Sequence, residues 1–105
     1  MPYSVIRSVP ARRDIRQFAR YLKREAGVAI TQKYLTTLEY DILTAIANSP
    51  NAFSWFHGTG EPYRAKLFRL ARSTYWIVYV VDDLKQRVEI VRLWYSAREP
   101  GTHGL

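Results

Sequence analysis

Cysteine is absent from the 105 residues of this chain, and histidine occurs only twice, as His57 and His103. Without cysteine the chain is not a disulfide-stapled secreted module. Two histidines far apart in the sequence, with no clustered carboxylates beside them, do not make a metal coordination shell. A glycine-rich nucleotide-binding loop is missing as well. We therefore expect no metal and no cofactor.

Long apolar runs are also absent. The longest, near Trp76 to Val81, is far shorter than the roughly 20 residues that a helix needs to cross a bilayer. The first residues lack the apolar central region of a cleavable signal. Together with the lack of cysteine, these absences predict a cytoplasmic protein that does not associate with membranes.

Acidic residues are scarce. Nine Asp and Glu stand against 16 Lys and Arg, which gives a formal net charge of +7 and a pI of about 10.0. A chain with this charge is drawn to polyanions or acidic partners, so nucleic acid, the ribosome and an acidic protein all fit. Surface arginine that serves only solubility is the alternative interpretation.

The hydrophobic fraction of 48% excludes a disordered chain. The length predicts one domain over residues 1–105, in which about 100–105 form a flexible tail. Apolar residues at three- and four-residue spacing predict helices over residues 11–26 and 30–48. Gly27 ends the first helix and Ser49-Pro50 the second. The short link at Gly27 predicts an antiparallel helical hairpin.

Strand patterns flank the hairpin. Alternation predicts a first strand over residues 3–9, stopped by Pro10, and three more at 63–71, 75–81 and 87–95. Short connections make the last three an antiparallel meander. The predicted fold is therefore two-layer α+β, with an N-terminal strand, a helical hairpin and a three-stranded antiparallel meander that completes one sheet. The hairpin covers one sheet face, and we expect the other face to be open.

Opposite its apolar stripe, the first predicted helix carries a basic ridge at four-residue spacing, which consists of Arg12, Arg16, Arg20 and Arg24 with Lys23 beside them. Its only acidic residues are Asp14 and Glu25. Because like charges at this spacing repel, the pattern indicates an acidic partner, with a merely solvated surface as the alternative. The aromatic residues Phe53, Trp55 and Phe56 follow the second helix and either anchor a loop, contact a partner or stack on bases.

Three groups of motifs follow in order along the chain. The helical motif is Ala11-x-x-Asp14-Ile15, followed by Tyr21, Gly27, Tyr34, Leu38-Glu39, Ile46 and Pro50. The central strands carry Arg69, Tyr75 and Tyr79. The last strand has Val88-Glu89-Ile90-Val91-Arg92-Leu93, followed by Ser96-Ala97-Arg98-Glu99-Pro100. Over nearly the whole chain, this order resembles the RelE/ParE superfamily of toxins from bacterial type II toxin–antitoxin pairs.

The resemblance implies a growth-inhibiting toxin, of the kind used in plasmid stabilisation, that forms a hetero-oligomer with a cognate acidic antitoxin. Members like ParE poison DNA gyrase, whereas members like RelE act in the ribosome and cut mRNA. The spacing of Arg69, Tyr75 and Tyr79 is more similar to the ParE branch. Trp76 and Tyr95 depart from the nuclease branch, which tends to place arginine after the central tyrosine and often histidine at the close of the last strand.

The ParE-like interpretation therefore comes first, and it does not require an enzyme. It implies that the target is bound through Arg69, Arg92, Trp94 and Arg98. It implies that the antitoxin is bound through Arg12, Arg16, Arg20 and Trp55.

The alternative is a ribosome-dependent endoribonuclease, in which Arg64, Lys66 and Arg98 hold the scissile phosphate and Tyr95 or His103 assists proton transfer. Tyr95 would serve only if those cations lowered its pKa from about 10. A third possibility is a basic module that binds nucleic acid or protein without toxicity, with an affinity that falls steeply with salt.

Overall fold

The computed structural model describes residues 2–53, 63–70 and 73–95. The elements, in chain order, are β1 (Ser4–Arg7), α1 (Val9–Ala26), α2 (Val28–Thr36), the π-helix η1 (Thr37–Ile42), α3 (Leu43–Asn48), β2 (Arg64–Leu70), β3 (Ser73–Asp82) and β4 (Arg87–Tyr95). This order confirms the predicted α+β fold. Among the described residues, none of the helices is both long and apolar enough to span a membrane.

The start of α1 corrects the prediction that Pro10 ends the first strand. The strand already ends at Arg7, and Pro10 lies within the first turn of the helix. Ser8 is the N-cap, and its Oγ accepts a hydrogen bond from the backbone N–H of Ala11 at 3.1 Å. Proline fits the first turn because its missing N–H would have no partner there. The pattern Ser-Val-Pro is therefore a helix start.

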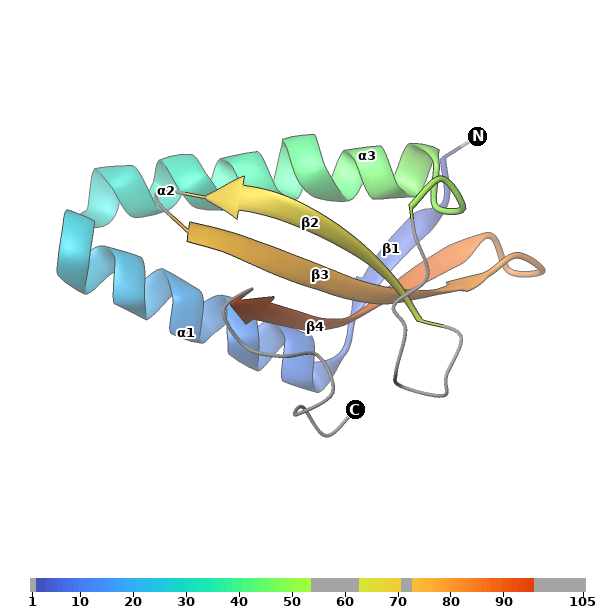
Figure 1. Ribbon diagram of the computed structural model, residues 1–105, viewed down its shortest axis with the longest axis horizontal. Helices are drawn as coiled ribbons and strands as arrows, with labels where there is room; N and C mark the ends of the chain where they lie inside the picture. The colour runs from blue at the N-terminus through green and yellow to red at the C-terminus, as the bar shows by residue number, and fades with distance from the viewer. Residues whose placement is uncertain (1, 54–62, 71–72, 96–105) are drawn as a thin grey trace.

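Gly27 ends α1 with a positive φ of 89° and leads directly into α2. Such a backbone conformation favours glycine because it has no Cβ. Two antiparallel helical arms result, as Figure 1 shows. The second arm begins two residues earlier than the predicted residue 30, and its helical turns continue through α2, η1 and α3 to Asn48. The predicted hairpin is thus confirmed, with a π-helical segment that periodicity did not reveal.

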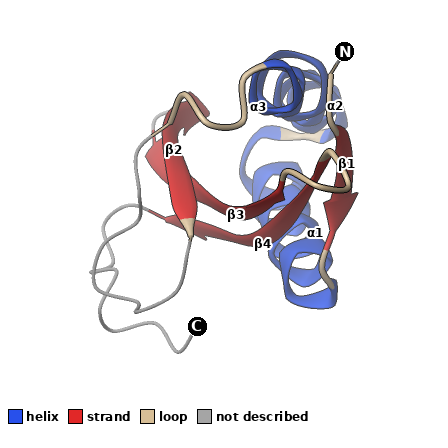
Figure 2. Ribbon diagram, turned by 90° about the vertical axis from the view of Figure 1, so that its right-hand side faces the viewer, coloured by secondary structure: helices blue, strands red, loops and turns tan. Residues whose placement is uncertain are grey.

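The four strands form one mixed sheet in the order β1-β4-β3-β2. Strand β1 runs parallel to β4, while β2, β3 and β4 form the predicted antiparallel meander. The helices lie together on one face of the sheet (Figure 2). The main core fills this interface with residues from α1, from the second helical arm and from the sheet, among them Phe18, Leu22, Leu38, Ile46, Ile77, Tyr79, Val88, Ile90 and Leu93.

A β-bulge in β4 decides which of its side chains face the helices. Tyr79 pairs with Ile90 and Val78 pairs with Arg92, so Val91 is an extra residue. Strict alternation would place Ile90 and Arg92 on the same face. Because of the bulge, Ile90 joins the helix-side core, whereas Arg92 shares the outer face with Val78.

The expectation of an open outer face is wrong at its centre. Ala65, Val78 and Trp94 form a second buried cluster there, with Tyr63 and Trp76 packed against it. Trp94 is only 3% exposed. Because the helices lie on the other face, the described members of this second cluster include no helix residue. They are aromatic and aliphatic side chains of the strands, together with Tyr63.

Candidate functional site

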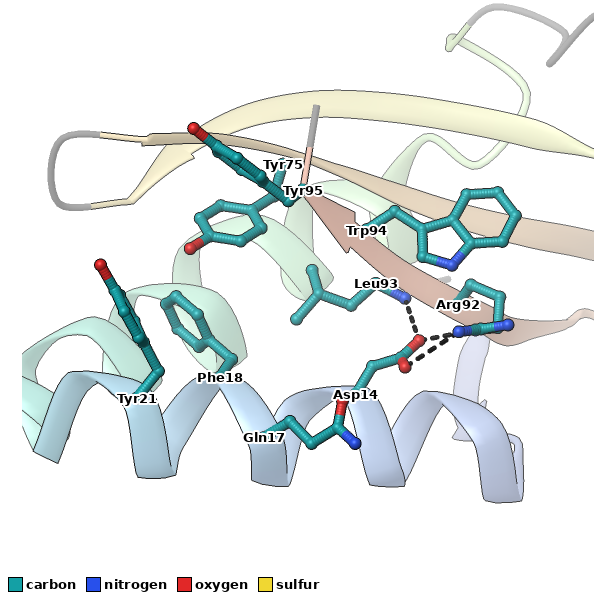
Figure 3. Close-up of a pocket in the computed structure, with 9 residues that line it drawn as sticks. All are labelled: Asp14, Gln17, Phe18, Tyr21, Tyr75, Arg92, Leu93, Trp94 and Tyr95. Atoms are coloured by element: carbon teal, nitrogen blue, oxygen red, sulfur yellow. Dashed lines mark hydrogen bonds and ion pairs between the residues drawn. The ribbon is translucent and has the colours of Figure 1, made fainter. Parts of the chain in front are cut away.

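A groove of about 430 Å³ lies between α1 and the end of β4. Figure 3 shows Asp14, Phe18 and Tyr21 projecting from α1 towards the end of the sheet, and Gln17 lying along the helix beside them. The sheet contributes the other lining residues, which are Tyr75, Arg92, Leu93, Trp94 and Tyr95. The helical residues recur at three- and four-residue spacing, so they form one stripe along α1. The groove therefore combines aromatic walls with a carboxylate and a guanidinium.

The carboxylate of Asp14 connects α1 to β4. It accepts hydrogen bonds from Arg92 Nε at 2.7 Å, from Arg92 Nη2 at 3.1 Å and from the backbone N–H of Leu93 at 3.0 Å. The Asp14 side chain is 10% exposed and that of Arg92 is 28% exposed. Planar, bidentate pairing of this kind is among the stronger ion-pair geometries in proteins. Arg92 also lies over the ring of Trp94, with 5.0 Å between Cζ and the ring centroid.

This arrangement exists because β1 is shorter than β4. The pairing of β1 with β4 stops at Arg7 and Ile90, so the second half of β4 has no strand beside it on that edge. There the Oγ of Ser8 donates to the carbonyl of Val91 at 2.9 Å, and Asp14 accepts from Leu93. Side chains of α1 and its cap thus satisfy backbone groups that a longer β1 would otherwise pair.

Aromatic rings form one end of the groove. Phe18 meets Tyr75 edge-on at a centroid distance of 5.0 Å, and Tyr75 lies 5.7 Å from Tyr95 and 5.9 Å from Phe68. Such contacts stabilise a ring cluster beyond simple burial. Tyr21 and Tyr95 remain 49% and 47% exposed. The groove therefore presents partly exposed aromatic side chains to solvent.

The residues proposed for RNA cleavage are not gathered in one place. Arg64 Nη1 donates to the carbonyl of Phe53 at 2.6 Å, and Lys66 Nζ lies 4.5 Å from the centre of the Phe53 ring. Both cations belong to β2 and share the helix-side face with their β3 partners Tyr79 and Ile77.

Tyr95 pairs instead with Tyr75, on the far side of β3. Arg64 pairs with Tyr79, which lies four residues along β3 from Tyr75. Arg64 and Tyr95 are therefore separated by about 13 Å along the strands and by roughly 10 Å across the sheet from β2 to β4. The described backbone therefore separates Tyr95 from Arg64. Arg98 and His103, the other predicted members of this site, lie outside the described residues, as does His57.

The predicted target-binding residues have different environments. Arg69 is exposed on the outer side of the edge strand β2. Arg92 is bound to Asp14, and Trp94 is buried. Their role in target binding stays a prediction. The same holds for Arg12, Arg16 and Arg20 in antitoxin binding, and Trp55 lies outside the described residues.

All basic residues of α1 are exposed: Arg12, Arg13, Arg16, Arg20, Lys23 and Arg24. Arg24 lies 3.5 Å from Glu25 in an exposed ion pair. Within the described part of the chain, the other five have no carboxylate within 4.0 Å. We call Arg12, Arg13, Arg16, Arg20 and Lys23 the α1 basic face.

At the opposite end of the sheet, two tyrosine hydroxyls donate hydrogen bonds to residues that lie in or beside turns. Tyr79 is fully buried and donates to the carbonyl of Pro50 at 2.7 Å, and burial raises its pKa to about 12 despite the opposing charge of Arg64. Tyr3 donates to Asp83 at 2.7 Å, which raises the pKa of Tyr3 and lowers that of Asp83. These contacts are structural, because they join the end of α3 and β1 to the β3–β4 turn.

Asp14 is the charged groove residue that sequence patterns did not assign to a site. It is one of only two acids in a strongly basic helix, and that contrast was the available signal for an internal partner. The described residues contain no group of three or more His, Asp or Glu side chains that could hold a metal ion.

Comparison with known proteins gives one family and solved structures of similar fold. The family model described as ParE toxin of type II toxin-antitoxin system, parDE, matches residues 5–100. The chain is similar to one in the crystal structure of the toxin–antitoxin complex RelBE2 from Mycobacterium tuberculosis, with 20% identity, a TM-score of 0.59 and coverage of 93% of this chain and 95% of that chain. It is also similar to a mutant of the E. coli toxin RelE in the free state, with 20% identity, a TM-score of 0.52 and coverage of 90% and 83%. At these identities both structures show a shared fold. A search of curated proteins returns no match.

Proposed function

This chain belongs to the ParE toxin family of type II toxin–antitoxin systems, and from that premise we propose that it arrests bacterial growth by poisoning DNA gyrase. The family match over residues 5–100 is the observation that carries the proposal. It agrees with the spacing of Arg69, Tyr75 and Tyr79, which resembles the ParE branch.

The arrangement of the basic residues supports a target-binding mechanism over RNA cleavage. General acid–base cleavage needs a proton-transfer group and phosphate-binding cations within hydrogen-bond reach of one reacting centre. Arg64 and Lys66 are engaged around Phe53, whereas Tyr95 contacts Tyr75 at the other end of the sheet. A ribosome-dependent nuclease remains the second candidate, because Arg64 and Lys66 lie on one strand face at which a phosphate would find two cations.

We propose that gyrase is bound through the end of β4 at Arg92 and Trp94, together with Arg69 and with Arg98, which follows β4 in the sequence. Arg92 is held by Asp14 and stacked on Trp94, so its position is fixed before the target arrives. A preorganised side chain loses less conformational entropy on binding than a free one. Trp94, which is buried, would support Arg92 and the backbone of β4.

For the antitoxin, we propose an acidic segment that lies along α1 and contacts Arg12, Arg16 and Arg20. The complementary charge favours this partner, because five exposed cations have no carboxylate nearby within the described residues. An apolar side chain of the same segment would enter the groove beside Tyr21 and Tyr95, which are both half-exposed.

The test in cells is induced expression with pulse labelling of DNA and protein synthesis. We expect DNA synthesis to stop first while translation continues, and co-expression of the cognate antitoxin to restore growth. The variant R64Q/K66Q should remain toxic, since it removes the two cations of the alternative nuclease site. R92Q should be less toxic, whereas K33Q, which removes an exposed charge from α2, serves as the control.

Early loss of translation with cleaved message, abolished by R64Q/K66Q in a folded variant, would replace gyrase poisoning by the nuclease mechanism. Circular dichroism and a thermal unfolding curve show whether R64Q/K66Q is folded, which matters because Arg64 hydrogen-bonds the chain at Phe53. Normal growth with soluble toxin present would contradict both mechanisms.

A further inference from the structure

The α1 basic face is an array of cations without internal counter-charges. Its members Arg12, Arg13, Arg16, Arg20 and Lys23 are all exposed. The acid that lies among them in sequence, Asp14, points into the groove and binds Arg92 and Leu93. The other acid of α1, Glu25, pairs with Arg24 at the far end of the helix. The fold therefore turns away from this face the one acidic residue that α1 carries between Arg12 and Lys23.

The exposed surface between Arg12 and Lys23 is also almost purely polar. Its exposed residues are the five cations, Gln17 and Tyr21. Gln17 and Tyr21 line the groove and so lie to one side of the helix. A docked amphipathic peptide, such as the proposed antitoxin segment, would find its apolar contacts in the groove beside this face and not on the face itself. The α1 basic face offers charge without such contacts, which suits a ligand whose own surface is a row of anions.

Geometry matches this face to a phosphate backbone. From Arg12 to Lys23 the helix rises by about 17 Å, at about 1.5 Å per residue. Duplex DNA carries one phosphate charge about every 1.7 Å of helix axis when both strands are counted, so a surface of this length faces a high density of anions. Four of the five cations are arginines, whose planar guanidinium group pairs with phosphate through two parallel N–H bonds.

We propose that the α1 basic face binds the phosphate backbone of duplex DNA, without sequence preference, when no antitoxin covers it. An α-helix fits against B-form DNA, whose major groove is wide, more readily than into the narrow major groove of A-form RNA. Single-stranded RNA is bound largely by stacking on aromatic side chains, and aromatic residues are absent from the α1 basic face. The inference rests on the proposed function only in that gyrase holds duplex DNA, which would place the ligand next to the toxin.

The first experiment measures binding of the full chain to a fluorescent 20-base-pair duplex by anisotropy over a salt series. If four cations contact phosphates, the slope of log K against log salt is about −3.6, and affinity falls about 150-fold between 50 and 200 mM salt. An RNA hairpin with the same number of phosphates is the second probe. Polyglutamate of matched charge, added as a competitor, represents an acidic protein.

The variant R16Q/R20Q removes two charges from the centre of the α1 basic face. We expect its slope of log K against log salt to become shallower, at about −1.8. The control K33Q/K85Q removes two exposed charges from other elements, giving the same net charge, and should retain the original slope. Glutamine preserves helix propensity in α1. R16K/R20K, which keeps the charges, should bind with a slope close to that of the unaltered chain.

Equal losses in R16Q/R20Q and K33Q/K85Q would overturn the proposal, because binding would then follow net charge alone. Binding of the RNA hairpin ten times tighter than the duplex would overturn it in favour of RNA. Polyglutamate and unlabelled duplex can be compared as competitors at equal concentrations of negative charge. If polyglutamate displaces the labelled duplex more effectively than the unlabelled duplex does, the face binds an acidic protein and the proposal is overturned. Absence of DNA binding at 50 mM salt would refute the proposal, while the gyrase proposal would be judged separately by arrest of DNA synthesis.

Discussion

Replacing Asp14 with asparagine tests whether the contact between α1 and β4 is energetically significant. The amide side chain of this D14N variant could still accept a hydrogen bond from the Leu93 N–H, but the charge-assisted bonds to Arg92 at 2.7 and 3.1 Å would be lost or weakened. Removing one partner of a fully buried ion pair costs about 3–5 kcal/mol. Here Arg92 is 28% exposed and can turn towards water, so we expect a loss of about 2 kcal/mol.

The assay is urea unfolding of the purified chain, followed by far-UV circular dichroism and tryptophan fluorescence. With an m-value of about 2 kcal/mol/M, the expected loss lowers the midpoint by about 1 M. E25Q is the matched control. It removes a carboxylate from the same helix, but its ion pair with Arg24 is exposed, so we expect a change below about 0.5 kcal/mol.

A double-mutant cycle with R92Q separates the pairwise interaction from other effects of the substitutions. We expect a coupling energy of at least about 1 kcal/mol, because the two side chains share two hydrogen bonds. Unfolding of D14N at the same urea concentration as E25Q would contradict a stabilising contact between Asp14 and Arg92. Simple addition of the effects of D14N and R92Q would contradict it as well.

Two further substitutions have effects that follow from local contacts. Y79F removes the buried hydroxyl that donates to Pro50 and should cost about 1–2 kcal/mol at pH 7. Because the folded-state pKa of Tyr79 is raised to about 12, the tyrosine of the unfolded chain loses its proton first. The free energy of unfolding therefore falls as pH rises from about 10 to 12, by up to nearly 3 kcal/mol. Between pH 9 and 11.5 the urea midpoint should decrease less for Y79F than for the unaltered chain, and an equal decrease would contradict this assignment. S8A removes both the cap of α1 and the hydrogen bond to Val91, so it should cost about 2 kcal/mol and lower the thermal midpoint, whereas S4A at an exposed strand position should not.

Local signals in the sequence were sufficient for most of the fold. Gly27 and Ser49-Pro50 end the helical arms where predicted, because glycine and proline restrict backbone conformations independently of distant contacts. The strand ranges were confirmed to within two residues at their ends. Pro10 was misassigned because proline both ends strands and begins helices, and the preceding Ser8 cap was the signal that distinguished the two.

The site was less predictable because it depends on register and on contacts distant in sequence. The extra residue Val91 reverses the side-chain alternation of β4, and alternation alone does not reveal a bulge. The partner of Asp14 lies 78 residues away in sequence. Burial of Trp94 on the outer face likewise results from the assembled sheet. Composition predicted the basic character of α1, whereas the groove beside it required the tertiary structure.

Gyrase poisoning is tested most directly by adding the purified chain to purified DNA gyrase, ATP and relaxed plasmid, with a parallel in vitro translation reaction. We expect supercoiling to stop, cleaved plasmid to accumulate as gyrase is trapped on DNA, and translation to proceed normally. Unimpaired supercoiling, together with cleavage of ribosome-bound message in the parallel reaction, would contradict gyrase poisoning.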